Sequence, residues 1–111
     1  DSGISPFCCY GQFSRLAGAD AAIFTSFGGR FPFTEEVCRK ICDGTETEMG
    51  GLRSIFPVPS GGMKWQLFKK MVQVYGPDAI FLVGGALLTE SDDLTANMHF
   101  YFEKLNEAVN K

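Results

Sequence analysis

The sequence predicts an α/β fold in which three strand-to-helix units follow an initial helix. Three short apolar runs carry this prediction, at residues 20–27, 55–59 and 78–83. Each run ends at a pair of glycines, and a segment of helical character separates one run from the next. Runs that are apolar throughout are typical of strands in a parallel sheet, because such a sheet is buried on both faces. We therefore expect three parallel strands joined by right-handed crossovers.

Four segments are predicted to be helices. Ser5 and Pro6 offer a capping hydroxyl and a proline in the first helical position, which favour a helix over residues 7–16. A second helix is expected to start at Thr34, with carboxylates in its first turn, and to end near Gly44. The other predicted elements are helices at residues 64–75 and 94–109 and loops at residues 45–53 and 87–93. The alternative for the first loop is that the second helix continues through Glu48.

Length and charge limit the classes of function. With 111 residues, 45% of them hydrophobic, the chain is expected to form one domain over residues 1–111. A net charge of −3 argues against a nucleic-acid partner, and Lys69-Lys70 is interpreted as the solvated side of a helix rather than a polyanion contact. No apolar run reaches the roughly 18 residues of a membrane helix, so no membrane partner is expected. The chain starts at Asp1 without a visible signal peptide and resembles a fragment or a processed chain.

The four cysteines do not form a disulfide framework. Cys8 and Cys9 are adjacent, and Cys38 and Cys42 lie one helical turn apart, a spacing that differs from the usual zinc-binding spacings. We interpret them as free thiols, half-buried in helices, in a protein of the reducing cytoplasm. A metal site shared by both pairs is the alternative.

Two of the glycine pairs suggest an anion site. Ser60, Gly61 and Gly62 follow the second predicted strand, and Gly84 and Gly85 follow the third. Glycine lets the backbone approach a ligand closely, and a following helix start offers unpaired N–H groups. The carboxyl ends of neighbouring parallel strands lie together, so one phosphate could be held between the two corners. The alternative is that the glycines only permit tight connections.

Several motifs, in order and correctly spaced, resemble a known family. GISPF, RLAGAD, GGRF, FPVPSGGM, YGPD and IFLVGG together resemble the C-terminal part of the RuBisCO large-chain barrel, and more closely the RuBisCO-like proteins. The resemblance covers nearly the whole chain. It implies a partial (β/α)8 (TIM) barrel in which the three predicted strands are similar to the sixth, seventh and eighth strands.

The resemblance also implies which residues contact a phosphorylated substrate. These are Arg30, Ser60, Gly61, Gly62, Gly84 and Gly85. Arg30 stands where carboxylating members of the family place a mobile lysine, and a guanidinium differs from an ammonium in reach and preferred geometry. This exchange disfavours CO2 fixation. Ala86 replaces a third glycine, so close backbone approach there is less favoured.

By resemblance, the complete family enzyme enolises a phosphorylated keto-sugar with Mg2+, in an enolase or isomerase reaction. The metal-binding lysine and acids of the family precede the segment that this chain resembles, so no metal ligand, cofactor or catalytic residue is assigned here. Glu35-Glu36 and Asp92-Asp93 are interpreted as helix-cap charges, and His99 as a surface or packing residue. The chain alone is expected to be inactive, and its partners are a phosphorylated small molecule and either its own copies or a complementary barrel half. The alternative is a non-enzymatic, self-associating remnant of a barrel.

Overall fold

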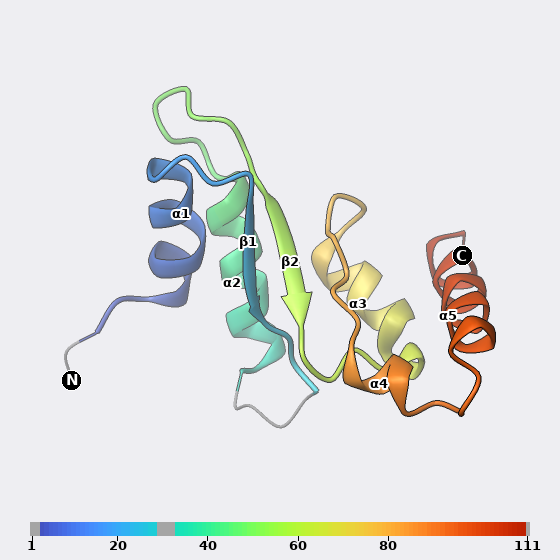
Figure 1. Ribbon diagram of the computed structural model, residues 1–111. Coiled ribbons are helices and arrows are strands. Elements are labelled where there is room, and N and C mark those ends of the chain that lie inside the picture. The colour runs from blue at the N-terminus through green and yellow to red at the C-terminus, as the bar shows by residue number, and fades with distance from the viewer. Residues whose placement is uncertain (1–2, 29–32, 111) are drawn as a thin grey trace.

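Helices and strands alternate along the chain in the computed structural model, which describes residues 3–28 and 33–110 (Figure 1). None of the helices in these two ranges is long and apolar enough to cross a membrane. The elements in chain order are the π-helical η1 (Phe7–Gln12), α1 (Phe13–Leu16), β1 (Ala21–Thr25), α2 (Glu35–Glu46), β2 (Phe56–Ser60), the 3-10 helix η2 (Trp65–Leu67), α3 (Phe68–Tyr75), α4 (Gly85–Leu88) and α5 (Leu94–Val109).

The sheet confirms the first two predicted strands and their direction. β1 and β2 pair in parallel, with a register that runs from Ala21 opposite Phe56 to Thr25 opposite Ser60. α2 connects them, as expected for a helical crossover between parallel strands. The chain therefore has an α/β fold.

The third predicted strand, at residues 78–83, is wrong as a regular strand. Within the described residues this segment makes a single parallel bridge, between Ser60 and Leu82. Its direction and its place beside β2 agree with the prediction, but its pairing is incomplete. It is called the third segment below.

Two prolines in β2 explain the incomplete pairing. Phe56 donates its N–H to the chain leading into β1, so by alternation Pro57 and Pro59 face the third segment. Their carbonyls accept hydrogen bonds from the N–H groups of Ile80 (3.0 Å) and Leu82 (3.1 Å). A regular parallel ladder would also need N–H groups from positions 57 and 59, and proline has none. The ladder on this side of β2 therefore lacks every second hydrogen bond.

The helices agree closely with the predictions, with one addition. The predicted helix at 7–16 is formed by η1 and α1, and α5 has the predicted bounds 94–109. The predicted helix at 64–75 starts with a 3-10 turn before α3. The loop predicted at 87–93 is partly wrong, because Gly85–Leu88 forms the short helix α4. A single helical turn has no apolar periodicity from which it could be predicted.

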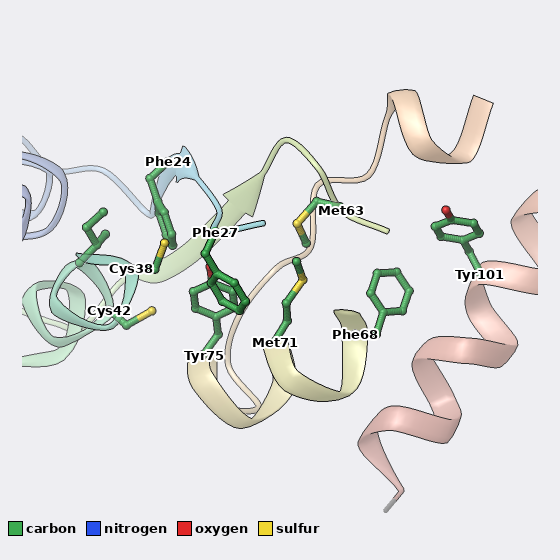
Figure 2. Close-up of a cluster of buried hydrophobic side chains, with 10 residues drawn as sticks. Phe24, Phe27, Cys38, Cys42, Met63, Phe68, Met71, Tyr75 and Tyr101 are labelled. Carbon is green, nitrogen blue, oxygen red and sulfur yellow. The ribbon is translucent and has the colours of Figure 1, made fainter. Parts of the chain in front are cut away.

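The core lies between the sheet and the helices α2 and α3. Figure 2 shows Phe27 beside Tyr75, with Met63 and Met71 between them and Phe68. The ring of Tyr75 packs against both Phe24 and Phe27, with centroid distances of 5.8 and 5.9 Å. Aromatic side chains from β1 and the residues after it therefore join the sheet to α3.

η1 packs on α2 at unusually short range. A Cβ atom built on Gly11 would lie 2.5 Å from the carbonyl carbon of Gly44, and one built on Gly44 would meet the carbonyl oxygen of Phe7. Because these neighbours are backbone atoms, no side chain can move aside. The two helices touch backbone to backbone, and glycine is required at both positions.

A buried arginine fixes the connection between α2 and β2. The Arg15 side chain is 4% exposed and donates hydrogen bonds to the carbonyls of Gly44 (3.2 Å), Thr47, Leu52 (2.8 Å) and Arg53 (2.9 Å). These carbonyls belong to the last turns of α2 and to the loop before β2. The guanidinium charge therefore faces the negative end of the helix dipole.

The sheet face opposite the helices is apolar and open. By the register, Ile23 of β1 and Phe56 of β2 lie on this face, together with Ile80 and Leu82 of the third segment. Ile23 is 60% exposed, and the other three are each 48% exposed. A parallel sheet is normally covered on both faces, so this one is half-covered by the described residues.

Candidate functional site

The strand-to-helix corners lie at one end of the molecule. β1 and β2 run in parallel, and the bridge between Ser60 and Leu82 sets the third segment alongside them in the same direction. Figure 1 shows β2 pointing to the end at which α4 lies. The corner after β2, at Gly61 and Gly62, and the corner at Gly84 and Gly85 therefore share this end. The predicted site residues of these two corners therefore lie on neighbouring segments of the chain.

The first corner is held by its own backbone. Gly61 and Gly62 have φ angles of 78° and 65°, which side chains rarely adopt. The Ser60 hydroxyl donates to the carbonyl of Phe24 (3.0 Å), and Lys64 N–H donates to the carbonyl of Gly62 (2.9 Å). The fold itself therefore requires glycine here, and the Ser60 oxygen stays half-buried with capacity to accept a hydrogen bond.

The second corner is different, because it is open. Gly84 and Gly85 do not have positive φ angles, and a Cβ atom on either would meet no described atom within 4 Å. Neither left-handed backbone nor close packing within the described residues requires glycine at Gly85. Free backbone there is what an anion-binding corner needs, since a side chain would keep a ligand from the N–H groups.

Arg30, the sixth predicted site residue, lies outside the described residues. The corner that precedes it begins with Gly28, whose φ angle is 84°. Just before this corner in the chain, the buried Ser26 hydroxyl shares a hydrogen bond of 2.7 Å with the Tyr75 hydroxyl. The Cys38 thiol contacts the carbonyl of Thr25 at 3.5 Å. A buried polar network from three elements therefore supports the end of β1.

Two of the four thiols, those of Cys38 and Cys42, are buried between α2 and its neighbours. Burial raises the pKa of Cys38, and burial raises the pKa of Cys42 to about 12. Burial also raises the pKa of Tyr75. All four cysteines are free, as predicted, but only Cys8 is half-buried: Cys9 is exposed, and Cys38 and Cys42 are buried. The alternative of a metal site shared by both pairs is wrong for the described residues, which hold no group of three His, Cys, Asp or Glu able to bind a metal.

Three of the four acids predicted to be helix-cap charges lie at a helix start: Glu35 and Glu36 in the first turn of α2 and Asp93 at the N-cap of α5. Asp93 caps α5 by accepting from Ala96 N–H at 3.1 Å. Glu35 lies in the first turn of α2 and accepts hydrogen bonds from Lys70 (3.1 Å) and Arg39 (2.9 Å). These two bonds lower the pKa of Glu35, and the bond from Lys70 has the larger effect. His99 is exposed on α5, as are Lys69 and Lys70 on α3. None of these groups lies in a predicted corner, so we assign no general base.

One buried polar residue near the second corner was missed by the sequence analysis. Asn97 on α5 is 2% exposed, and its side chain bonds to the turn between α4 and α5. The sequence signals the cap at Asp93 but gives no sign that Asn97 faces inward. An asparagine four residues after a cap, on the side of the helix that carries Tyr101, is the only hint.

Comparisons with known proteins place the chain in a family. No family model matches it. It is 43% identical over 94 residues, 85% of its length, to 5-methylthioribulose-1-phosphate isomerase of Rhodospirillum rubrum, and 40% identical over 92 residues, 83% of its length, to ribulose bisphosphate carboxylase-like protein 1 of Rhodopseudomonas palustris. The structure of a rubisco-like protein from Alicyclobacillus acidocaldarius superposes with a TM-score of 0.83 and 27% identity over 95% of this chain and 26% of that protein.

The chain spans about a quarter of the length of these relatives, because each match covers 25% of the relative's own sequence. The matched part is the C-terminal part of the relatives. Sequence and fold agree on the same group of proteins, and this confirms the resemblance carried by the motifs. The chain belongs to the RuBisCO family and corresponds to the C-terminal part of its RuBisCO-like members.

Proposed function

We propose that this chain is the phosphate-binding part of a RuBisCO-like enzyme that acts on a phosphorylated keto-sugar. The observation that carries the proposal is the placement of the two glycine corners, Gly61-Gly62 and Gly84-Gly85, at one end of parallel segments. The names of two relatives support the substrate class, because one is a methylthioribulose phosphate isomerase and another a putative diketo-methylthiopentyl phosphate enolase. In the proposed enzyme, the described units are the last three of a (β/α)8 barrel.

The proposed division of work follows from the side chains present. Backbone N–H groups at Gly61, Gly62, Gly84 and Gly85 hold and orient the phosphate, and Arg30 adds a positive charge. The Ser60 hydroxyl donates to the carbonyl of Phe24, so its oxygen accepts a hydrogen bond from a hydroxyl of the sugar. Orientation of a substrate contributes to the rate of a reaction that other residues perform. Enolisation also needs a base and a group that stabilises the enolate oxygen, which Mg2+ supplies when bound. The described residues offer no donor set for that ion, so we derive no metal-dependent step within this chain and propose that it is inactive alone.

A titration with inorganic phosphate tests this binding role. In amide-resolved NMR, phosphate is expected to shift the resonances of Gly61, Gly62, Gly84 and Gly85 more than those of α2, and equimolar chloride should not. Gly85→Ala should weaken binding about fivefold or more without loss of stability, because a Cβ there meets no described atom. Gly3→Ala, which is equally free of contacts, is the matched control. Unchanged corner resonances at millimolar phosphate would contradict the proposal.

A second candidate function is self-association without catalysis. The open sheet face favours it, because Ile23, Phe56, Ile80 and Leu82 are each between 48% and 60% exposed on one side of a parallel sheet. In the enzyme proposal the remaining strands of the barrel cover this face, and in the second candidate another copy of the chain covers it.

Sedimentation velocity at micromolar concentration separates the two proposals. Self-association predicts a dimer or larger species that Ile23→Thr combined with Leu82→Thr converts to a monomer. The enzyme proposal predicts that a separately produced polypeptide with the remaining barrel strands binds the wild-type chain and binds the double variant less well. If the wild-type chain stays monomeric at this concentration, the second candidate is excluded.

A further inference from the structure

Two side chains bond to α4: that of Asn97 on α5 and that of Thr89, the C-cap residue of α4 itself. The Asn97 amide group donates to the carbonyls of Leu87 (2.8 Å) and Ser91 (3.1 Å), and its oxygen bonds to the Ser91 hydroxyl. The Thr89 hydroxyl donates to the carbonyl of Gly85 at 2.9 Å. All these partners lie in α4 or in the turn that follows it.

The helix itself is too short to set its own direction. α4 has four residues, Gly85–Leu88, and one helical turn is unstable without outside contacts. Its internal bonds include Leu88 N–H to the carbonyl of Gly84 (3.1 Å) and Thr89 N–H to that of Gly85 (3.1 Å). Asn97, in contrast, is buried on a 16-residue helix and is 2% exposed. The longer helix therefore supplies the rigid point and α4 is attached to it.

We infer that Asn97 is a positioning residue for the corner at Gly84 and Gly85. It bonds to the carbonyl of Leu87, two residues beyond Gly85, and so fixes the direction in which the N–H groups of the corner point. It does not contact a ligand and takes no part in chemistry. The inference rests on the proposed function for its importance, but the bonds themselves can be tested without any ligand.

Asn97→Asp isolates the amide donors. The aspartate keeps the volume of the side chain and replaces the N–H2 group by an oxygen, which cannot donate to the carbonyls of Leu87 and Ser91. Asn106→Asp is the matched control, because Asn106 is exposed on the same helix and receives the same change in charge. Thr89→Val is a second, milder variant at an exposed position, since it removes the hydroxyl bond to Gly85 and keeps the side chain's shape.

Two ligand-free measurements test the inference. In Asn97→Asp, hydrogen exchange of the bonded amides of Leu88 and Thr89 should accelerate about fivefold or more, and the resonances of Gly84 and Gly85 should shift. Exchange in α2 should stay as in wild type. Thr89→Val should show the same pattern to a smaller extent, and Asn106→Asp should show none of it. A purely structural role for Asn97 would instead accelerate exchange throughout the chain in proportion to lost stability.

Phosphate binding supplies the last readout. If the wild-type chain binds phosphate, Asn97→Asp should raise the dissociation constant for phosphate about fivefold, measured at a temperature where both proteins are folded. If wild type does not bind phosphate, the proposed function fails while the exchange data still decide the positioning role. Equal exchange at Leu88 and Thr89 in Asn97→Asp and Asn106→Asp would overturn the inference. If Asn97→Asp fails to fold, Ser91→Ala, which removes the hydroxyl that donates to the Asn97 oxygen, tests the positioning role by the same two amides.

Discussion

The helices α2 and α5 are docked in very different ways. α2 has 12 residues, of which five are buried, whereas α5 has 16 residues, of which Asn97 and Tyr101 are buried. α2 touches η1 on one side and the sheet on another, and its C-terminal turn is bonded to Arg15. α5 rests against α3 and α4, and Figure 1 shows it at one extremity of the molecule. The chain thus closes its α2 side by itself and leaves its α5 side partly open.

The open side of α5 is apolar. Met98 and Phe102 are 40% and 58% exposed, and they line a groove of about 270 Å3 between α5 and the third segment. Leu82, on the open sheet face, lines the same groove, so the two uncovered surfaces are continuous. A large exposed apolar surface usually has a partner that covers it. In the proposed enzyme, further strands and helices of the barrel would lie there.

Loss of the Arg15 side chain should give the largest effect on stability. Arg15→Ala removes donors to four carbonyls at the end of α2 and in the loop before β2. Because buried carbonyls would lose their partners, we expect a loss of about 4 kcal/mol in the free energy of unfolding. Arg15→Lys keeps the charge with fewer donors and should lose about half as much. Chemical denaturation measures both, and a loss under about 1 kcal/mol would show that α2 does not depend on this residue.

The contact between η1 and α2 should be nearly as sensitive. Gly11→Ala places a Cβ atom 2.5 Å from the carbonyl carbon of Gly44, so the two helices must move apart. We expect a loss of about 3 kcal/mol, at the upper end of the cost of overpacking. Gly3→Ala adds the same methyl group where no atom lies within 4 Å and is expected to change stability by less than about 0.5 kcal/mol. Equal effects of the two changes would disprove the tight helix contact.

Sequence reasoning succeeded where one residue type has one physical consequence. The prediction for α5, which rests on capping residues such as Asp93, is confirmed in its bounds. The apolar runs of β1 and β2 gave both strands and their parallel direction. The family resemblance is confirmed too, because the motifs occur in several separate places. The glycine corners lie at one end as expected, although their role in phosphate binding stays a prediction.

The features that the sequence could not predict depend on how each helix or strand is oriented toward its neighbours. Pro57 and Pro59 were read as part of a strand, but only the register reveals that both face the third segment and interrupt its ladder. Gly11 and Gly44 are 33 positions apart, so no local pattern indicates their contact. Asn97 could equally have faced solvent. Such facts require knowledge of which side of an element meets which neighbour.

Neighbouring residues on α5 sharpen the contrast between its two sides. Tyr101 is 6% exposed and packs on Phe68 with a centroid distance of 5.6 Å, whereas Phe102 is 58% exposed. Tyr101→Ala should lower the free energy of unfolding by about 2 to 3 kcal/mol, and Phe102→Ala by less than about 1 kcal/mol. Thermal and chemical denaturation of both variants checks this. If Phe102→Ala costs as much as Tyr101→Ala, the open side of α5 is covered in solution by a second copy.

Alkaline pH should weaken the α2 side through its buried thiol, with the smallest effect of the four. Burial raises the pKa of Cys42 from 9.0 to about 12 in the folded chain. Below about pH 9 the thiol keeps its proton in both states and stability is unaffected; as pH rises from 9 towards 12, the unfolded chain releases this proton first, so stability falls. We expect a loss of about 1 kcal/mol at pH 10 that is specific to this thiol.

Cys42→Ala tests this effect. Because the variant also loses packing, the quantity to compare is the change of unfolding free energy with pH and not its absolute value. The fall in unfolding free energy between pH 8 and pH 10 should be about 1 kcal/mol smaller in the variant than in wild type. Cys38 and Tyr75, whose pKa values are also raised by burial, keep a residual slope in both proteins. Cys9→Ala, at an exposed position, should leave the slope unchanged. Parallel pH profiles for wild type and Cys42→Ala would mean that the α2 side opens to solvent as readily as the α5 side.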